Sequence, residues 1–247
     1  MTDPTIAPPL SAEYRRLYDR LLERVAQAKR QRNNLCAFWP LIGTEFRPSE
    51  GILAVGRAVN GWRSGSFLIE DLRLPEKRHD VLDRASGYRG DLGWVAEREG
   101  DSGYNTRRSQ FWMVLKEVVA RRTGQPLSSS WSQQLAWTNL YKVAPSQKGN
   151  PTLGLRRVQR EPGSELLRHE ITTLKPRAVV FLTGLGWARH FLDLLDVDYK
   201  TCLQKGLAER GGLVEGVPFV VARHPQRKSR GKWVDETWDM LEAVTGR

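Results

Sequence analysis

Apolar residues recur along the chain in two patterns that predict different elements. Short continuous apolar runs, bounded by glycine, proline or polar residues, are typical of strands buried on both faces. Four such runs occupy residues 51–55, 135–141, 178–182 and 217–221. Apolar residues at helical spacing predict helices over about 11–32, 109–122, 162–175, 184–195 and 233–244. We expect the third helix to begin at Pro162, because proline is favoured in a first turn.

The order of these elements predicts an α/β fold. Strands that alternate with helices pair in parallel and carry helices on both faces, so we expect a three-layer αβα sandwich with a central four-stranded, mostly parallel sheet. Residues 1–50 form an N-terminal helical extension in this interpretation, and residues 51–247 form the α/β domain. A polar, glycine-rich stretch at about 63–103 is long for a connection, which indicates a functional insert or an added subdomain.

The composition excludes several classes of protein. The chain has 247 residues, of which 40% are hydrophobic, so it can bury a core and is not disordered along its whole length. Its two cysteines, Cys36 and Cys202, are too few for a disulfide scaffold, a four-cysteine zinc site or a four-cysteine iron–sulfur cluster. No apolar run approaches the roughly 18 residues of a membrane span, and the N-terminus lacks the apolar core of a signal peptide. We therefore expect a cytoplasmic protein that does not associate with membranes.

A formal net charge of +11 points to a polyanionic partner, most commonly nucleic acid. The arginines and lysines of residues 15–32 fit a solvated helix face. The basic clusters at 107–108, 156–160 and 224–232 instead fall in turn-like sequence next to strand ends, where a groove can form. Charge alone does not distinguish DNA from RNA or from a membrane surface.

Polar side chains follow the predicted strands. Asn60 comes after the first strand, and Asn139 and Lys142 stand at the end of the second. His224 follows the fourth strand. Because ligands of open parallel sheets bind beyond the carboxyl ends of the strands, we expect these residues to converge on one rim. The four histidines have no spacing typical of metal ligands, so we expect neither a metal nor a cofactor.

Four short motifs, in this order, resemble those of the uracil-DNA glycosylase superfamily. A strand followed by a glycine-led loop is matched by residues 54–61, and a central strand with a base-reading asparagine is matched by residues 137–145. A strand after a Lys-Pro turn is matched by residues 174–180, and a strand that ends in His-Pro by His224-Pro225-Gln226. Residues 109–112, Ser-Gln-Phe-Trp, are similar to a helix start of the mismatch-specific branch.

The resemblance implies a monofunctional DNA glycosylase, which flips a deaminated or modified pyrimidine out of DNA and hydrolyses its N-glycosidic bond to leave an abasic site. His224 then stabilises the departing base, and Asn139 reads the Watson–Crick edge. Tyr104 falls where the family has an aromatic residue that stacks on the base. We expect a monomer that binds DNA. The other residues of the expected base pocket are Gly56, Ala58 and Trp62, and the expected DNA contacts are Arg227, Lys228, Arg230, Lys232 and Lys142.

The first motif departs from the family pattern. Where the familiar branches often carry Asp or Asn followed by Pro to position the water, this chain has Ala58-Val59. Asn60 takes over this catalytic role in our interpretation, and Glu70 or Asp71 of the insert is the alternative. The insert also allows a wider pocket. We therefore favour a modified pyrimidine over plain uracil, such as a hypermodified base of phage DNA, in which case the protein acts in antiviral defence rather than in DNA repair.

Two other functions stay open at the level of the sequence. A catalytically inactive DNA-binding relative of the same fold is favoured by Ala58-Val59. A nucleotide-cofactor enzyme is indicated by residues 184–189, Gly-Leu-Gly-Trp-Ala-Arg, which partly resemble a dinucleotide fingerprint but lack its third glycine.

Overall fold

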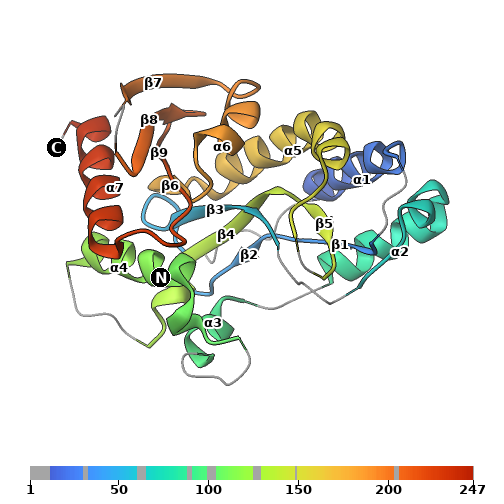
Figure 1. Cartoon of the computed structure of the whole chain (residues 1–247), viewed down its shortest axis with the longest axis horizontal. Coiled ribbons are helices and arrows are strands. Elements are labelled where there is room, and N and C mark those ends of the chain that lie inside the picture. The colour runs from blue at the N-terminus through green and yellow to red at the C-terminus, as the bar shows by residue number, and fades with distance from the viewer. Residues whose placement is uncertain are drawn as a thin grey trace, which may run out of the picture.

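The protein is an α/β protein built on a seven-stranded mixed sheet (Figure 1). The computed structural model describes residues 12–29, 33–59, 65–87, 91–98, 104–124, 129–147, 149–202 and 206–246. The strands lie in the order β2–β4–β3–β6–β9–β8–β7. Their bounds are β2 Leu41–Ile42, β3 Ile52–Ala58, β4 Leu135–Tyr141, β6 Ala178–Phe181, β7 Val197–Cys202, β8 Ala208–Val214 and β9 Val217–Ala222. A separate two-stranded sheet pairs β1 Leu35–Ala37 with β5 Val143–Pro145.

The four strands predicted from the sequence form the centre of the large sheet. Strands β4, β3, β6 and β9 are neighbours in that order, and each adjacent pair is parallel. The expected number of four strands is too small, because three further strands join the sheet. Strand β2 pairs antiparallel with β4, and β8 and β7 extend the opposite edge, also antiparallel. Strands β8 and β9 are joined at Glu215-Gly216, both with positive φ, a backbone form that matches the twist of a two-residue hairpin.

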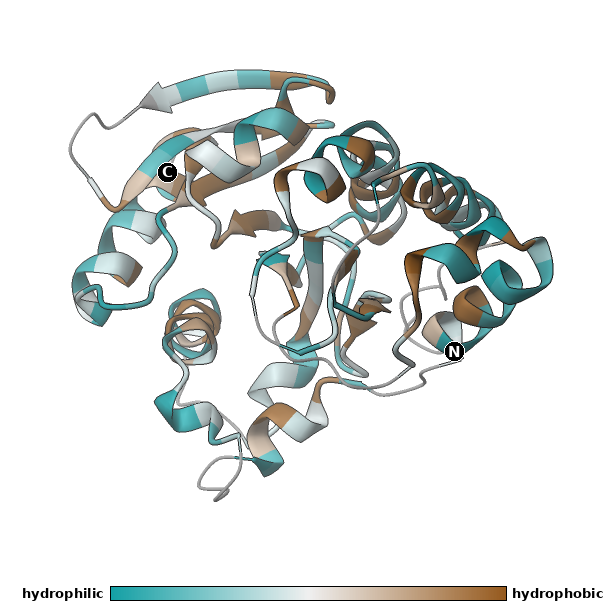
Figure 2. Cartoon of the chain, turned by 45° about the vertical axis from the view of Figure 1, so that its right-hand side comes forward, coloured by the Kyte–Doolittle hydropathy of each residue, from teal (hydrophilic) through white to brown (hydrophobic). Residues whose placement is uncertain are grey.

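Helices pack on both faces of this sheet, because successive side chains of each strand point to opposite faces. On one face, Ala54 and Val180 pack with α4 Gln110–Thr123 and α7 Arg230–Thr245. On the other face, Val55 and Phe181 pack with α5 Leu153–Leu174 and α6 Leu185–Leu192. Figure 2 shows hydrophobic and hydrophilic bands along these helices, as expected for helices that bury one side.

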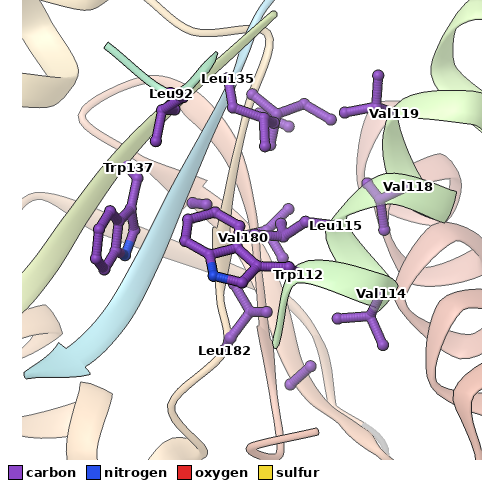
Figure 3. Packing of buried hydrophobic residues seen from close by; sticks show 14 of the residues in the cluster. Leu92, Trp112, Val114, Leu115, Val118, Val119, Leu135, Trp137, Val180 and Leu182 are labelled. Carbon is purple, nitrogen blue, oxygen red and sulfur yellow. The ribbon is translucent and has the colours of Figure 1, made fainter. Parts of the chain in front are cut away.

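Aromatic and branched side chains fill the space between α4 and the sheet. Trp112 and Leu115 of α4 point toward Val180 and Trp137 of the strands (Figure 3). The indole rings of Trp112 and Trp137 meet edge to face, with their centroids 5.1 Å apart. This packing fixes α4 and β4 relative to each other, and Asn139 follows Trp137 by two residues on the same face of β4.

Helix α5 begins nine residues earlier than predicted. It runs from Leu153, and Pro162 lies inside it, so the prediction that Pro162 begins the helix is wrong. The side chain of Thr152 caps the helix by accepting a hydrogen bond from the Leu155 amide, and proline inside a helix removes one backbone bond at a cost of about 3 kcal/mol. Burial compensates this cost, because Pro162 and Gly163 are buried and Gly163 lies close against Phe191 and the Leu140 carbonyl.

The N-terminal helix and the insert pack together on the side of α5. Helix α1 Ala12–Ala26 contacts α5, and its apolar face shares one hydrophobic cluster with α2 Pro75–Ser86. The other short elements of the insert are the 3₁₀-helix η1 Ile69–Arg73 and helix α3 Gly93–Glu97, and the remaining 3₁₀-helices are η2 Thr106–Arg108 and η3 Trp131–Gln134. Within the described residues, no helix combines the length and the apolar character that crossing a membrane requires.

Candidate functional site

A pocket of about 450 Å³ lies beyond the carboxyl ends of β3, β6 and β9. Arg57 near the end of β3, Thr183 and Gly184 after β6, and Arg223 and His224 after β9 line it. Between β3 and β6 the order of strands reverses along the chain, which is the place where open α/β sheets bind ligands. The other lining residues are Leu185, Gly186, Trp187, Glu209, Gln226 and Lys228.

His224 is held in this pocket by its own backbone and by α7. The indole Nε1 of Trp233, in the first turn of α7, donates a hydrogen bond of 2.7 Å to the Arg223 carbonyl. The Gln226 amide donates to His224 Nδ1 at 3.3 Å. Because Nδ1 accepts this bond, the neutral imidazole carries its proton on Nε2. Burial, together with the positive charge of Arg57, lowers the pKa of His224 to about 4, so at neutral pH the ring is an uncharged donor.

Arg57 lines this pocket, although the sequence did not single it out. Its Nε donates a hydrogen bond of 2.8 Å to the Thr183 carbonyl, and its Cζ lies 5.1 Å from the centroid of the Trp187 ring. Burial lowers the pKa of Arg57, and Glu209 opposes this effect, so the guanidinium stays charged in a partly dry pocket. A charged residue in the otherwise apolar run 52–58 was the available signal.

Glu209 of β8 brings a carboxylate to the same pocket. Its Oε2 accepts a hydrogen bond of 2.7 Å from the Leu185 amide at the start of α6, and its Oε1 pairs with Arg223 Nε at 3.2 Å. These contacts fix the carboxylate between the helix terminus and the loop that carries His224. Sequence reasoning missed Glu209 because β8 was not predicted.

Asn139 lies outside this pocket. Its carboxamide is buried, and its Oδ1 occupies the space next to Gly56, its partner in the register of β3 and β4. The Asn139 Nδ2 has no hydrogen-bond partner among the described residues, and a buried donor left in this state costs about 1–3 kcal/mol. Gly56 and Arg57 are successive on β3, so Asn139 and Arg57 belong to opposite faces of the sheet end. The structure therefore does not place His224 and Asn139 in one described cavity.

An aromatic group connects Tyr104 with the strand of Asn139. Tyr104 is half exposed, its hydroxyl donates to Ser109 Oγ at 3.2 Å, and its ring lies 6.2 Å from that of Trp94. The ring of Trp94 lies 6.5 Å from that of Trp137. Through Trp94 and Trp137, Tyr104 is thus connected to the α4 side of the sheet, where Asn139 lies, and not to the pocket of His224.

The first motif is described only in part. Ala58 ends β3 and packs against the core clusters on both faces of the sheet. The expected catalytic residue Asn60 and the expected pocket residue Trp62 lie outside the described residues. Ala58 itself has no polar atom in its side chain, so it cannot orient a water molecule there.

Among the described residues, two of the four cations in the segment after His224 form ion pairs and two do not. Arg227, with a φ of 59°, and Lys228 pair with no carboxylate among the described residues, and Lys228 also lines the pocket. Arg230 Nε lies 2.6 Å from Glu117 of α4, and Lys232 Nζ lies 3.6 Å from Glu236. Arg227 and Lys228 are therefore the better placed of the four to meet a phosphate.

Lys142 is not a surface residue, which corrects its expected contact with DNA. Its side chain is fully buried, and its Nζ lies 2.7 Å from Glu170 Oε1 of α5. The same ammonium donates to Thr138 Oγ1 at 2.5 Å and to the Asn139 carbonyl at 2.8 Å. Lys142 follows β4 directly, and the chain turns inward there to pair β5 with β1, so the ammonium faces the core.

Across the part of the chain that the structure describes, no group of three or more His, Cys, Asp and Glu side chains lies close enough to hold a metal ion. No protein-family model and no curated protein matches this sequence. The geometry of the pocket is therefore the basis for a functional proposal.

Proposed function

We propose that this protein is a monofunctional DNA glycosylase that releases a deaminated or modified pyrimidine from DNA. The observation that carries the proposal is the uncharged imidazole of His224 beside the Arg57 guanidinium, in a pocket at the reversal of the strand order. A base that leaves its sugar takes the electron pair of the C–N bond and becomes an anion. Fixed donors and a fixed positive charge at that point stabilise the transition state.

His224 Nε2 donates a hydrogen bond to an oxygen of the departing base in this mechanism, and Arg57 adds a charge that does not depend on pH near neutrality. Positive charge develops on the sugar, and the oxygen of a water molecule then bonds to C1′ while a proton of that water passes, directly or through solvent, to the base anion. The carboxylate of Glu209, held by Leu185 and Arg223, supports a role in orienting that water. Glu209 thereby joins Asn60 as a candidate for this step.

Asn139 remains the proposed reader of the base. Its buried Nδ2 is a donor without a hydrogen-bond partner among the described residues. Such a donor destabilises the folded protein unless a ligand accepts its hydrogen bond. The proposed substrate is a modified pyrimidine, such as a hypermodified base of phage DNA. A role in antiviral defence follows from such a substrate.

A catalytically inactive DNA-binding protein of the same fold is the second candidate. It is favoured by the separation of Asn139 from the His224 pocket and by the apolar Ala58 in the first motif. Replacement of His224 by Ala distinguishes the two functions. A glycosylase loses turnover and keeps its affinity for DNA, whereas a binding protein has no turnover to lose.

The test uses duplexes that carry uracil, damaged pyrimidines or hypermodified pyrimidines, with alkali cleavage as the readout of abasic sites. Wild-type protein is expected to produce alkali-labile strands on at least one duplex, and His224→Ala is expected to lose this activity. His79→Ala, a change at an exposed position of α2, is the matched control and should retain it. Alkali-stable strands on every duplex would reject the glycosylase and leave the binding protein.

A further inference from the structure

Some of the arginines and lysines of the protein form ion pairs with carboxylates, and others do not. The four arginines of α1 each face a carboxylate, and the pairs are Arg15–Asp83, Arg16–Glu13, Arg20–Glu165 and Arg24–Glu161. Exposed pairs of this kind neutralise each other and leave little attraction for a distant anion. The basic helix face that dominates the N-terminal sequence therefore contributes little to any polyanion site.

Four arginines on α5 and α6 behave differently. Arg156, Arg157 and Arg160 lie near the start of α5, and Arg189 lies on α6, which runs beside it (Figure 1). Among the described residues, none of the four forms an ion pair with a carboxylate. We call these four residues the α5–α6 arginine surface. These arginines form no direct ion pair among the described residues, and Asp193, which follows α6, acts against their charge at His190.

Three members of this surface, Arg156, Arg160 and Arg189, act on common neighbours. Burial lowers the pKa of His190 of α6, and the charges of Arg160, Arg189 and Arg156 lower it further. Burial raises the pKa of Tyr141, and Arg160 and Arg156 both act to lower it. The guanidinium groups of both helices thus act on common neighbours, although like charges repel. Such an arrangement is favourable when an anion binds between them.

Trp187 joins this surface to the pocket. The Cζ of Arg156 lies 4.8 Å from the centroid of the Trp187 ring, and the Cζ of Arg57 lies 5.1 Å from the same centroid. Arg57 and Trp187 line the pocket together with His224. The indole of Trp187 therefore contacts the guanidinium of Arg57 in the pocket and that of Arg156 on α5, and both contacts are cation–π interactions.

We propose that the α5–α6 arginine surface binds the phosphodiester backbone of the DNA strand whose nucleotide enters the pocket. The proposal rests on the proposed function, which supplies DNA as the ligand, and adds a second contact area to the loop of Arg227 and Lys228. The strand would pass from that loop, across the mouth of the pocket and over Trp187, onto the start of α5 and the last turn of α6. Continuity with the pocket favours DNA over an anionic membrane, which does not need a nucleotide-sized cavity.

The experiment measures DNA affinity against salt for Arg157→Gln/Arg189→Gln, since both side chains are exposed and their loss should leave the fold intact. Each lost phosphate contact lowers the slope of log K against log salt by about 1. The double variant is expected to reduce the slope by about 2 and the affinity at moderate salt about tenfold or more. Arg16→Gln/Arg20→Gln removes the same charge from α1 and is expected to change the affinity less than twofold.

Equal slopes in the two double variants would overturn the proposal. It would also be overturned if Arg157→Gln/Arg189→Gln weakened binding to phosphatidylserine vesicles while DNA affinity matched the α1 control. Base release by the same preparations separates this result from the proposed function. Wild-type protein that releases a base but shows equal slopes would reject the arginine surface alone. A reduced slope without any base release would support the surface and count against the glycosylase.

Discussion

The carboxamide oxygen of Asn139 lies in the space that a side chain on Gly56 would occupy. The two residues are partners in the parallel register of β3 and β4, so a methyl group at Gly56 has no room unless the carboxamide moves. The glycine of the first motif and the asparagine of the central strand are thus one structural unit. Glycine is required there for close approach rather than for a turn.

Replacing Gly56 with Ala is expected to displace the Asn139 carboxamide. Overpacking of this kind costs typically about 1–3 kcal/mol, which urea denaturation measures. If Asn139 reads the base, Gly56→Ala should lose base release to the same degree as Asn139→Ala. The matched control is Gly154→Ala, where the added methyl group meets nothing within 4 Å and should be neutral or slightly stabilising. A Gly56→Ala protein with full activity would show that the carboxamide takes no part in the reaction.

The depressed pKa of His224 predicts a specific dependence of stability on pH. The unfolded chain takes up a proton on this residue near pH 6.5, whereas the folded protein does so only near pH 4. The free energy of unfolding should therefore fall as the pH drops from about 6.5 to 4, and the contribution is fully lost below pH 4. The ring is partly exposed, so the loss is on the order of 1–2 kcal/mol after solvent screening.

Denaturation of wild type and of His224→Gln between pH 7 and pH 4 gives the free energy of unfolding of each protein as a function of pH. The difference between the two curves is the contribution of His224. The Gln variant should show the flatter curve. Arg57→Gln should raise the pKa of the imidazole, seen by NMR titration, because it removes a nearby positive charge. An imidazole that titrates at its ordinary value in wild type would remove the basis for a neutral donor in the pocket.

The buried cluster of Lys142, Glu170 and Tyr14 predicts a large loss of stability from a small change. Tyr14 Oη donates to Glu170 Oε1 at 2.5 Å, and Lys142 Nζ lies 2.7 Å from the same oxygen. Glu170→Gln leaves the ammonium buried without its counter-ion, so thermal or urea unfolding should show a loss of about 3–5 kcal/mol.

Glu165→Gln on the same helix breaks only the half-exposed pair with Arg20 and should cost less than about 1 kcal/mol. Because Lys142 does not reach the surface, the folded double variant Lys142→Met/Glu170→Met should bind DNA as wild type does. Weaker DNA binding by that folded variant would restore Lys142 as a DNA contact.

The positive φ of Arg227 predicts that glycine is tolerated there. This backbone form costs an L-residue about 1–2 kcal/mol, and glycine adopts it freely. Arg227→Gly should therefore leave the free energy of unfolding unchanged or slightly higher, while DNA affinity falls severalfold because a cation beside the pocket is lost. Ser49→Gly, also at a positive φ, is the control and should leave DNA affinity unchanged. Full DNA affinity in Arg227→Gly would exclude this arginine from the interface.

The central part of the fold was predictable because buried parallel strands need continuous apolar runs. The runs that contain Val55, Trp137, Val180 and Val220 all became neighbours in the sheet. Strands β7 and β8 were missed because their sequences, VDYKTC and AERGGLV, mix charged residues and glycine with apolar ones. Antiparallel strands at an edge need only one apolar face, so their signal is weaker.

The site could be predicted only where a strand end was visible in the sequence. His224 was found because an apolar run stops just before it, whereas Glu209 was hidden in the unpredicted β8. Lys142 was misplaced because a lysine after a strand suggests solvent, and its partner Glu170 lies 28 positions away on a helix. Pairings of this kind depend on the folded arrangement and not on local sequence.

The most direct test of the proposed function is mass spectrometry of the free bases released from natural phage and bacterial DNAs. Wild-type protein is expected to release one modified or deaminated pyrimidine, and His224→Ala is expected to release none while it still binds the same DNA. A wild-type reaction that releases no base from any of these DNAs, or a His224→Ala protein that releases the base at the wild-type rate, would contradict the account.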